Sequence, residues 1–182
     1  HVQNIRFLAS IFGEENRADT MVEILSRRLQ LIDDALSETS TEQKPRVLML
    51  AGDFFVSGAG STGDSIIRRA GGLNAAAEAG VEGIAQIGVE GIAEMNPAVI
   101  LLPSVNTTKP ELPTEILNNP ALAHVEAVKD GRVFVIRSQW VGTLSHWNVH
   151  GVEMLAELFY PDLFADRSEN GFAYEPVLAT TS

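Results

Sequence analysis

Residues 87–102 constrain the fold of this chain more than any other segment, because they join a short helix directly to a buried strand. Gly88–Met95 is predicted to be helical, and Asn96-Pro97 ends the helix, since proline disfavours helical backbone in the residue before it. Val99–Leu102 follows as an uninterrupted apolar run, as is typical of strands covered on both faces. The segment therefore predicts a sheet packed between helices.

Two more apolar runs predict further strands of the same sheet, at Arg46–Ala51 and Val133–Ile136. Helices are expected between the strands and after them, at Ser65–Ala70, Leu112–Asn118 and Ser145–Phe159. Strands that alternate with helices predict an α/β fold. We expect a three-layer lobe with a mostly parallel central sheet flanked by helices.

A long amphipathic helix is predicted ahead of the sheet, over Asn16–Leu36. Its apolar residues recur at spacings of three and four, which places them on one face of a helix: Ala18, Met21, Val22, Leu25, Leu29, Ile32 and Leu36. The polar segment Ser37–Pro45 ends the helix and leads into the first strand. The chain therefore consists of a long helix followed by an α/β lobe.

The composition excludes several classes of partner and site. The chain has 24 acidic and 13 basic residues and a net charge of −11, which disfavours nucleic acid and anionic membranes as partners. It has no cysteine, so disulfides, thiolate metal sites and cysteine nucleophiles are excluded. No apolar run approaches the roughly 20 residues of a membrane span. The sequence starts at His1 without a methionine, and we expect a processed or truncated piece.

Gly58–Gly63 matches the G-x-G-x-x-G pattern of dinucleotide-binding folds. That fold requires the first glycine at the end of a strand and an acidic residue at the tip of the next strand. Here the strand ends near Ala51, well before the first glycine, and no strand ending in an acidic residue is predicted near position 80. We expect a loop over Gly52–Gly63 with Asp64 as the N-cap of the following helix. A nucleotide-dependent oxidoreductase that uses Gly58–Gly63 stays open as an alternative.

Aromatic side chains indicate where a ligand is expected. Phe54 and Phe55 follow the first strand, and Trp140 and Trp147 flank the loop after the third. Ligands of open α/β sheets bind outside the carboxyl ends of the strands, where both pairs are predicted to lie. Ser57 belongs to the same loop as the phenylalanines. We predict that these side chains face a ligand, with core packing as the alternative for each phenylalanine.

His146, His150 and Glu153 fall on one face of the last predicted helix, at spacings that a transition-metal site can use. They lack the His-Glu-x-x-His order of a zinc protease, and we predict neither a metal site nor a cofactor. The sequence also contains no Ser-His-Asp elbow, paired catalytic carboxylates or phosphate-binding loop. The chain is therefore predicted not to be an enzyme.

Four segments carry short motifs in a fixed order: Phe7–Leu36, Ser65–Asn74, Ile87–Leu102 and Ala127–Phe134. The second ends in Ala-Gly-Gly-Leu-Asn, the third combines Glu90 with a proline ahead of a strand, and the fourth reads Ala-Val-Lys-Asp-Gly-Arg-Val-Phe. Together they resemble the interlobe helix and the A-G-G-x-N, S-x-E…P-D and A-V-K-x-G-R-V-Y motifs of substrate-binding proteins of ABC importers for iron-siderophores, haem and cobalamin. The resemblance covers about residues 5–164.

This resemblance implies two lobes with the ligand between them. It implies that residues 1–40 form the bridging helix and a remnant of the N-terminal lobe, and that residues 41–182 form the C-terminal α/β lobe. The implied ligand is a small-molecule metal chelate of the iron-siderophore, haem or cobalamin type, and the implied partner is the membrane permease of the importer. Glu90 matches the family's permease-docking residue. The implied location is periplasmic or extracytoplasmic, with anchoring as a lipoprotein an option for the full-length form.

Three departures from the family pattern bear on function. Gly88 replaces the usual Ser, Ala98 replaces the usual Asp, and Ser145-His146-Trp147 replaces the Ser-Pro-Arg opening of the last helix. The missing Arg removes a group that would bind an anionic ligand, whereas His146 becomes a candidate contact for a metal complex or haem. The long helix is expected to expose apolar side chains in an isolated piece, which predicts a homodimer. A stand-alone interaction module is the second alternative function.

Overall fold

The predicted apolar runs form the centre of one sheet. The computed structural model describes residues 2–105, 114–143, 147–165 and 177–178. Strands β1 (Arg46–Ala51), β5 (Val99–Ser104) and β6 (Val133–Arg137) lie side by side in parallel. Every residue of Val47–Leu50 and Val99–Leu102 is buried, which explains why both runs are apolar on both faces.

Four short strands extend this centre. Two of them, β2 (Phe55–Ser57) and β4 (Ile84–Gln86), continue the sheet in antiparallel fashion beyond β1. Strand β3 (Leu73–Asn74) pairs in parallel with β1, and β7 (Val177–Leu178) pairs antiparallel with β6. The order is β4-β2-β1-β5-β6-β7, with β3 beside β1 off this path. The α/β fold with a parallel centre is confirmed.

A tight reversal directly after β1 explains the unpredicted strand β2. The 3-10 turn η2 (Gly52–Phe54) holds Asp53 and Phe54 at positive φ angles of 56° and 58°, a conformation that few non-glycine residues adopt. The chain therefore turns back and β2 pairs with the end of β1, with Ala51 opposite Phe55. The prediction of a loop throughout Gly52–Gly63 is wrong for this reason.

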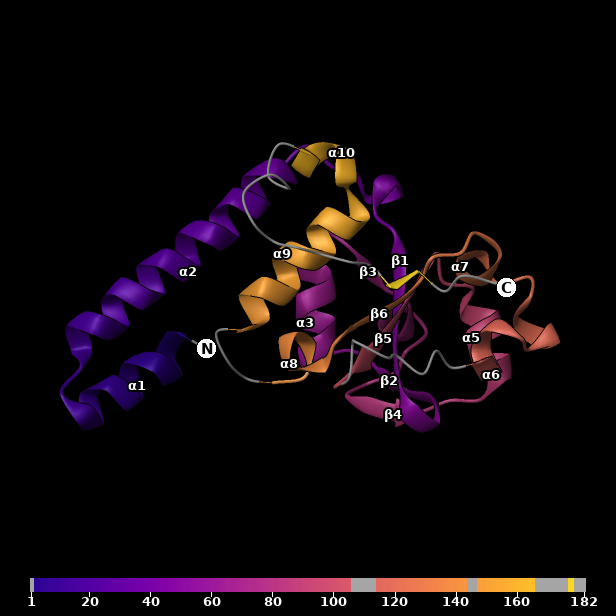
Figure 1. Ribbon diagram of the computed structural model, residues 1–182, viewed down its shortest axis with the longest axis horizontal. Helices are drawn as coiled ribbons and strands as arrows, with labels where there is room; N and C mark the ends of the chain where they lie inside the picture. The colour runs from indigo at the N-terminus through magenta and orange to yellow at the C-terminus, as the bar shows by residue number, and fades with distance from the viewer. Residues whose placement is uncertain (1, 106–113, 144–146, 166–176, 179–182) are drawn as a thin grey trace.

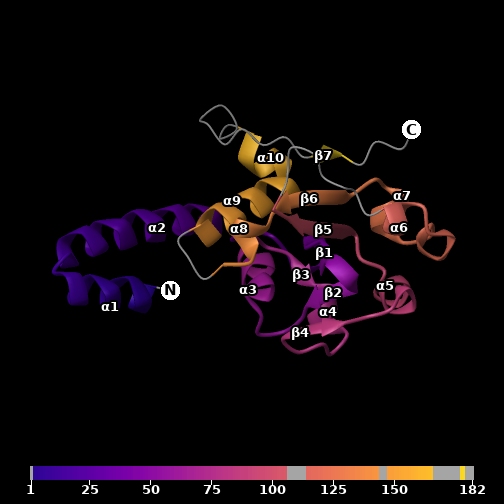
Figure 2. The ribbon, with the colours of Figure 1, turned by 60° about the horizontal axis from the view of Figure 1, so that its bottom comes forward.

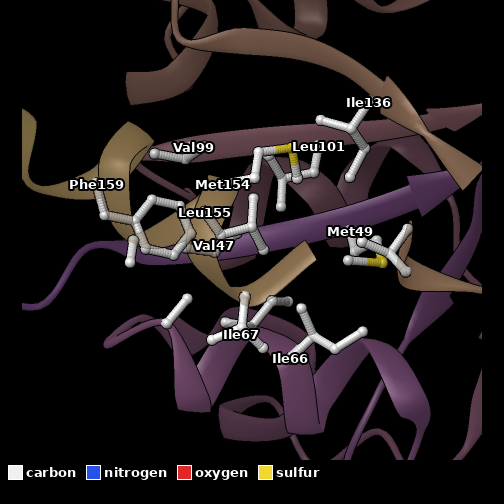
Figure 3. Close-up of a cluster of buried hydrophobic side chains, with 14 of the residues drawn as sticks. Val47, Met49, Ile66, Ile67, Val99, Leu101, Ile136, Met154, Leu155 and Phe159 are labelled. Carbon is white, nitrogen blue, oxygen red and sulfur yellow. The ribbon is translucent and has the colours of Figure 1, made fainter. Parts of the chain in front are cut away.

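Alternate residues of the central strands point to opposite faces of the sheet. On the first face, Val47, Met49 and Leu101 belong to a buried cluster with side chains of α3 (Thr62–Arg69) and α9 (Trp147–Phe159), part of which is drawn in Figure 3. On the second face, Leu48 and Ile100 belong to another buried cluster. The sheet thus separates two cores.

Different helices cover the two cores. Figures 1 and 2 both show α5, α6 and α7 on the opposite side of the sheet from α2, α8 and α9. The first core also receives side chains from α8 (Ser138–Val141) and α10 (Pro161–Phe164). The second core lies under α4 (Ala75–Glu78), α5 (Val89–Met95), α6 (Thr114–Leu117), η3 (Pro120–Leu122) and α7 (Glu126–Lys129).

The helices α1 (Val2–Phe12) and α2 (Glu15–Ala35) form a helical arm that projects from the lobe (Figure 1). The predicted long helix is therefore confirmed, with both ends displaced by one residue. Ile32 of α2 is 1% exposed and joins the first core, whereas Met21 of the predicted apolar stripe is 40% exposed. Among the described residues, no helix is long and apolar enough to cross a bilayer.

Local capping sets where the helices begin and end. The helix α3 begins at Thr62, because the Ser61 hydroxyl oxygen accepts a hydrogen bond from the backbone N–H of Asp64 at 3.1 Å. The prediction of Asp64 as the N-cap is therefore wrong. The helix α5 ends at Met95, because its C-cap Asn96 adopts a left-handed conformation with φ of 40° ahead of Pro97. A 3-10 turn, η1 (Thr41–Gln43), precedes β1.

Candidate functional site

The parallel strands β1, β5 and β6 end at the same edge of the sheet, which we call the carboxyl edge. The turn η2 follows β1 at this edge, and α8 follows β6 directly. Open α/β sheets bind ligands at this edge, because loops and helix ends diverge there and leave side chains accessible. The predicted residues Phe54 and Trp140 both lie on the elements that leave it.

Three aromatic side chains gather at the β6 end of the carboxyl edge. The ring of His150 lies 6.4 Å from that of Trp140 in a stacked arrangement and 5.4 Å from that of Trp147. We call Trp140, Trp147 and His150 the aromatic cluster. Trp147 is 42% exposed, whereas Trp140 is partly buried against the first core. The structure therefore brings the two predicted tryptophans together through a shared histidine.

The backbone of α8 fixes the position of Trp140. Gly151 of α9 packs so closely against it that an added Cβ would lie 2.4 Å from the Trp140 carbonyl oxygen. Only glycine permits this approach between the two helices. The Arg137 guanidinium lies 5.3 Å from the centre of the Trp140 ring, within the range of a cation–π contact. The contact with Gly151 thus fixes the backbone of Trp140, and the contact with Arg137 covers one face of its ring.

Arg28 connects the helical arm to the aromatic cluster. Its Nε donates to Oε1 of Glu153 at 2.6 Å, and its Nη2 donates to Oε2 of the same carboxylate. The same Nη2 lies 3.1 Å from Nδ1 of His150. The Arg28 and Glu153 side chains are 25% and 14% exposed, so water screens this ion pair less than it screens one on an open surface. Sequence reasoning missed Arg28.

The Arg28 guanidinium therefore contacts the face of α9 that carries His150 and Glu153. Among the described residues, no group of histidine and carboxylate side chains is arranged to hold a metal ion. His146, the third member of the predicted face and a predicted ligand contact, lies outside the described residues.

The predicted phenylalanines do not join the aromatic cluster. Phe54 packs against the second core, which favours the structural alternative for this residue. Phe55 is 41% exposed on β2. Because β1 and β5 lie between β2 and β6, three strand spacings of about 4.8 Å, or roughly 14 Å, separate Phe55 from the β6 end of the edge. A ligand that contacts both Phe55 and the aromatic cluster must therefore be large.

Ser57 lies at the end of β2 and serves the local packing. An added Cβ on Gly63 would lie 2.7 Å from the Ser57 Cβ, so this side chain is pressed against the start of α3. Its carbonyl oxygen accepts a hydrogen bond from Nδ2 of Asn74 at 2.8 Å. These contacts hold Ser57 against Asn74 and the start of α3, and its contact with a ligand stays a prediction.

The glycine-rich segment Gly58–Gly63 encloses a carboxylate. Asp64 Oδ2 accepts the backbone N–H of Gly60 at 3.1 Å, and Oδ1 accepts from Arg68 Nε at 2.8 Å and Asn74 Nδ2 at 2.9 Å. Burial raises the pKa of Asp64, but the hydrogen bonds from Arg68, Asn74 and Gly60 outweigh it, so the net pKa is lowered. An ionised carboxylate therefore already accepts the Gly60 N–H of this segment and would repel a phosphate there, which argues against the nucleotide-binding alternative.

Glu90 lies at the other end of the carboxyl edge. It is exposed in the first turn of α5. The backbone N–H of Ile87, just before this helix, donates to the Phe54 carbonyl oxygen at 3.0 Å, which ties the start of α5 to the turn after β1. Glu90 and the aromatic cluster thus lie at the same edge but on elements that cover opposite faces of the sheet.

Comparison with known proteins places the chain in a family. A family described as periplasmic binding protein matches residues 1–140. The chain belongs to the periplasmic binding protein family. The predicted resemblance is therefore confirmed, and so is the expectation of a binding protein rather than an enzyme, because the relatives found are binding proteins.

Two relatives illustrate the similarity. The molybdate-binding protein MolA of Haemophilus influenzae is 30% identical over 167 residues, which are 90% of this chain and 46% of that protein. Its structure with bound molybdate matches with a TM-score of 0.78 and 29% identity, over 91% of this chain and 50% of that one. A periplasmic heme-binding protein of Pseudomonas aeruginosa matches with a TM-score of 0.76 and 27% identity, over 88% and 59% of the two chains. The chain thus spans about half the length of MolA.

Proposed function

We propose that this chain is the C-terminal ligand-binding lobe of an ABC-importer substrate-binding protein, which captures a small molecule outside the cytoplasm and delivers it to a membrane permease. The aromatic cluster at the carboxyl edge carries this proposal, because it gathers accessible rings where α/β sheets bind ligands. Membership of the periplasmic binding protein family supports it.

The proposed division of the chain places the bridging helix and a remnant of the N-terminal lobe in residues 1–40, and the C-terminal lobe in residues 41–182. The projecting arm supports this division, since its exposed apolar side chains suit burial against a further lobe (Figure 1). A protein with two lobes would enclose the ligand between them, so we expect this chain alone to bind weakly.

The proposed ligand is a metal chelate of the iron-siderophore, haem or cobalamin type. Large, partly apolar chelates bind aromatic faces, and Trp147 offers an exposed ring at this site. The similarity to a heme-binding protein supports this class.

The chelate proposal is tested by titrating the chain with haem, a ferric siderophore and cobalamin. Trp147→Ala is expected to weaken binding of the preferred chelate about tenfold, as truncation of an aromatic contact residue does. Leu163→Ala is the matched control, because Leu163 is a similarly exposed apolar residue, 52% accessible, beyond the far end of α9. Equal affinity of both variants for every chelate would contradict the role of the cluster.

Molybdate is the second candidate ligand, and the similarity to MolA favours it. An oxyanion needs hydrogen-bond donors or cations, and Arg28 and Arg137 are the cations that contact the cluster. Calorimetric titration with molybdate separates the two candidates. Saturable molybdate binding without any chelate binding would replace the chelate proposal.

Glu90 is proposed to contact the permease. It is exposed at the carboxyl edge, where an acidic group can meet a basic pocket of a partner. In the full-length protein, Glu90→Ala should reduce uptake while ligand affinity stays unchanged. Glu94→Ala is the matched control, because Glu94 is also exposed on α5, one turn later. Unchanged uptake with Glu90→Ala would refute the assignment.

The isolated chain is proposed to form a homodimer through its helical arm. Phe7, Ile11 and Phe12 of α1 are 66%, 58% and 75% exposed, and Ile24 of α2 is 54% exposed. An apolar surface of this kind favours association in water. Sedimentation at several concentrations should show a dimer that Phe12→Ser weakens; a monomer at every concentration would refute the proposal.

A further inference from the structure

Arg28 contacts two residues of α9 at once, and one of these contacts restricts the protonation of a histidine. Its guanidinium donates to both oxygens of Glu153, and Nη2 lies 3.1 Å from Nδ1 of His150. An arginine side chain has five N–H donors and no acceptor. The contact with His150 is therefore a hydrogen bond only when Nδ1 is the accepting nitrogen.

This requirement places the proton of the neutral ring on Nε2, because a neutral imidazole has one donor and one acceptor nitrogen. Glu153 does not reverse the preference. Both of its oxygens accept from Arg28, and Oε2 lies 3.8 Å from Nδ1, too far for a hydrogen bond. An imidazolium would direct a second donor at the guanidinium. Among the described residues, charged side chains near the ring include Arg28 from α2, Glu153 from α9 and, across Trp140, Arg137.

We infer that Arg28 is a positioning residue that fixes His150 as the neutral Nε2–H tautomer, so that His150 acts as a hydrogen-bond donor and not as a metal ligand. In metal-binding histidines the ring proton is placed the other way. The nitrogen that does not bind the metal carries the proton and donates it to a carboxylate, carbonyl or water. In this chain that nitrogen faces a cationic donor. Coordination of a metal through Nε2 would require an imidazolate or rupture of the contact with Arg28.

The tautomer of His150 limits the class of ligand that can bind at the aromatic cluster. This step rests on the proposed function. A ligand at the aromatic cluster is held by ring stacking and hydrogen bonds, without coordination of its metal by His150. Chelates whose metal is held entirely by their own donor atoms meet this condition, as do oxyanions. Haem ligated by His150 and bare metal ions do not.

Nitrogen-15 NMR of the histidine rings tests the tautomer directly, with His150→Gln used to assign the signals. At a pH at which the ring is neutral, Nδ1 of His150 should show the chemical shift of an unprotonated nitrogen, and Nε2 that of a protonated one. A hydrogen bond from a charged donor favours this tautomer by about tenfold or more. A proton on Nδ1 in the unmodified chain would overturn the inference without recourse to any variant.

Two variants test the role assigned to Arg28. Arg28→Met should shift His150 to a mixture of tautomers, whereas Arg27→Met should leave it unchanged. Arg27 is the matched control, because it lies on the same helix and pairs with the exposed Glu23. Tautomers that are identical in Arg28→Met and the unmodified chain would show that another group fixes the ring.

Titration with Zn²⁺ alone tests the exclusion of metal. The His150 signals of the unmodified chain should not respond to stoichiometric Zn²⁺, and Arg28→Met should bind Zn²⁺ at His150 at least about tenfold more tightly. Saturable Zn²⁺ binding at His150 in the unmodified chain would overturn the inference. Failure of every chelate and of molybdate to bind would contradict the proposed function but leave the tautomer result standing.

Discussion

Gly151→Ala tests how closely α8 and α9 must approach to build the aromatic cluster. An added Cβ would lie 2.4 Å from the Trp140 carbonyl oxygen, whereas side-chain carbons essentially never come within 3.0 Å of a neighbour. The obstacle is backbone, so the two helices must move apart. Overpacking of this kind costs about 1–3 kcal/mol, and the better helix propensity of alanine returns up to about 1 kcal/mol. We expect a net loss of about 1 kcal/mol in the free energy of unfolding.

Urea denaturation followed by circular dichroism measures this loss, and tryptophan fluorescence reports the displacement of Trp140. Gly91→Ala is the control, because Gly91 also lies within a helix, but its added Cβ would meet Ile87 at an ordinary 3.6 Å. That variant should be stabilised by up to about 1 kcal/mol. Equal stabilisation of both variants, with unchanged fluorescence, would refute the close approach of α8 and α9.

Three further substitutions test the buried polar groups. Asp64→Asn should lower the free energy of unfolding by about 1–3 kcal/mol at neutral pH. Because the pKa of Asp64 in the folded chain is lowered from 3.8, the stability difference between the unmodified chain and the variant should be full above pH 3.8 and should shrink as the pH falls through the folded pKa, as urea titrations would measure. Tyr160→Phe removes a hydrogen bond of 2.8 Å to the Gly71 carbonyl oxygen and should cost about 0.5–1.5 kcal/mol in thermal unfolding; an unchanged melting temperature would contradict that bond. Asn148 is 7% exposed and its amide has no hydrogen-bond partner among the described residues. Asn148→Leu should therefore raise the free energy of unfolding by about 1–3 kcal/mol, and a destabilised variant would reveal a partner for the amide.

The central strands could be predicted from the sequence because burial on both faces leaves an uninterrupted apolar run. Strands β2 and β4 could not, since each has three residues and largely accessible side chains. Their pairing depends on the reversal at Asp53 and Phe54, two non-glycine residues at positive φ that no local pattern marks. The start of α3 was misplaced because Ser61 and Asp64 are both good capping residues. The Asp64 carboxylate instead accepts hydrogen bonds from Arg68, one turn later in the same helix, and from Asn74.

The candidate site was predictable where its residues follow a strand. Trp140 and Trp147 both lie close in sequence to the end of β6, so strand order alone places them together. Arg28 could not be paired in this way, because 125 residues separate it from Glu153. Its position was nevertheless informative, since a charged residue lies between Leu25 and Ile32 on the apolar stripe of α2. A cation within such a stripe indicates a buried acidic partner.

The separation of the two cores by the sheet has a mechanical consequence. Trp140 packs on the first core and the helix that carries Glu90 packs on the second, and among the described residues these two buried clusters share no member. Because protein interiors are close-packed, the strands cannot move without displacing the side chains on both of their faces. The helical arm adds side chains to the first core, so a displacement of the arm would reach the helices over the second core by moving the strands between them.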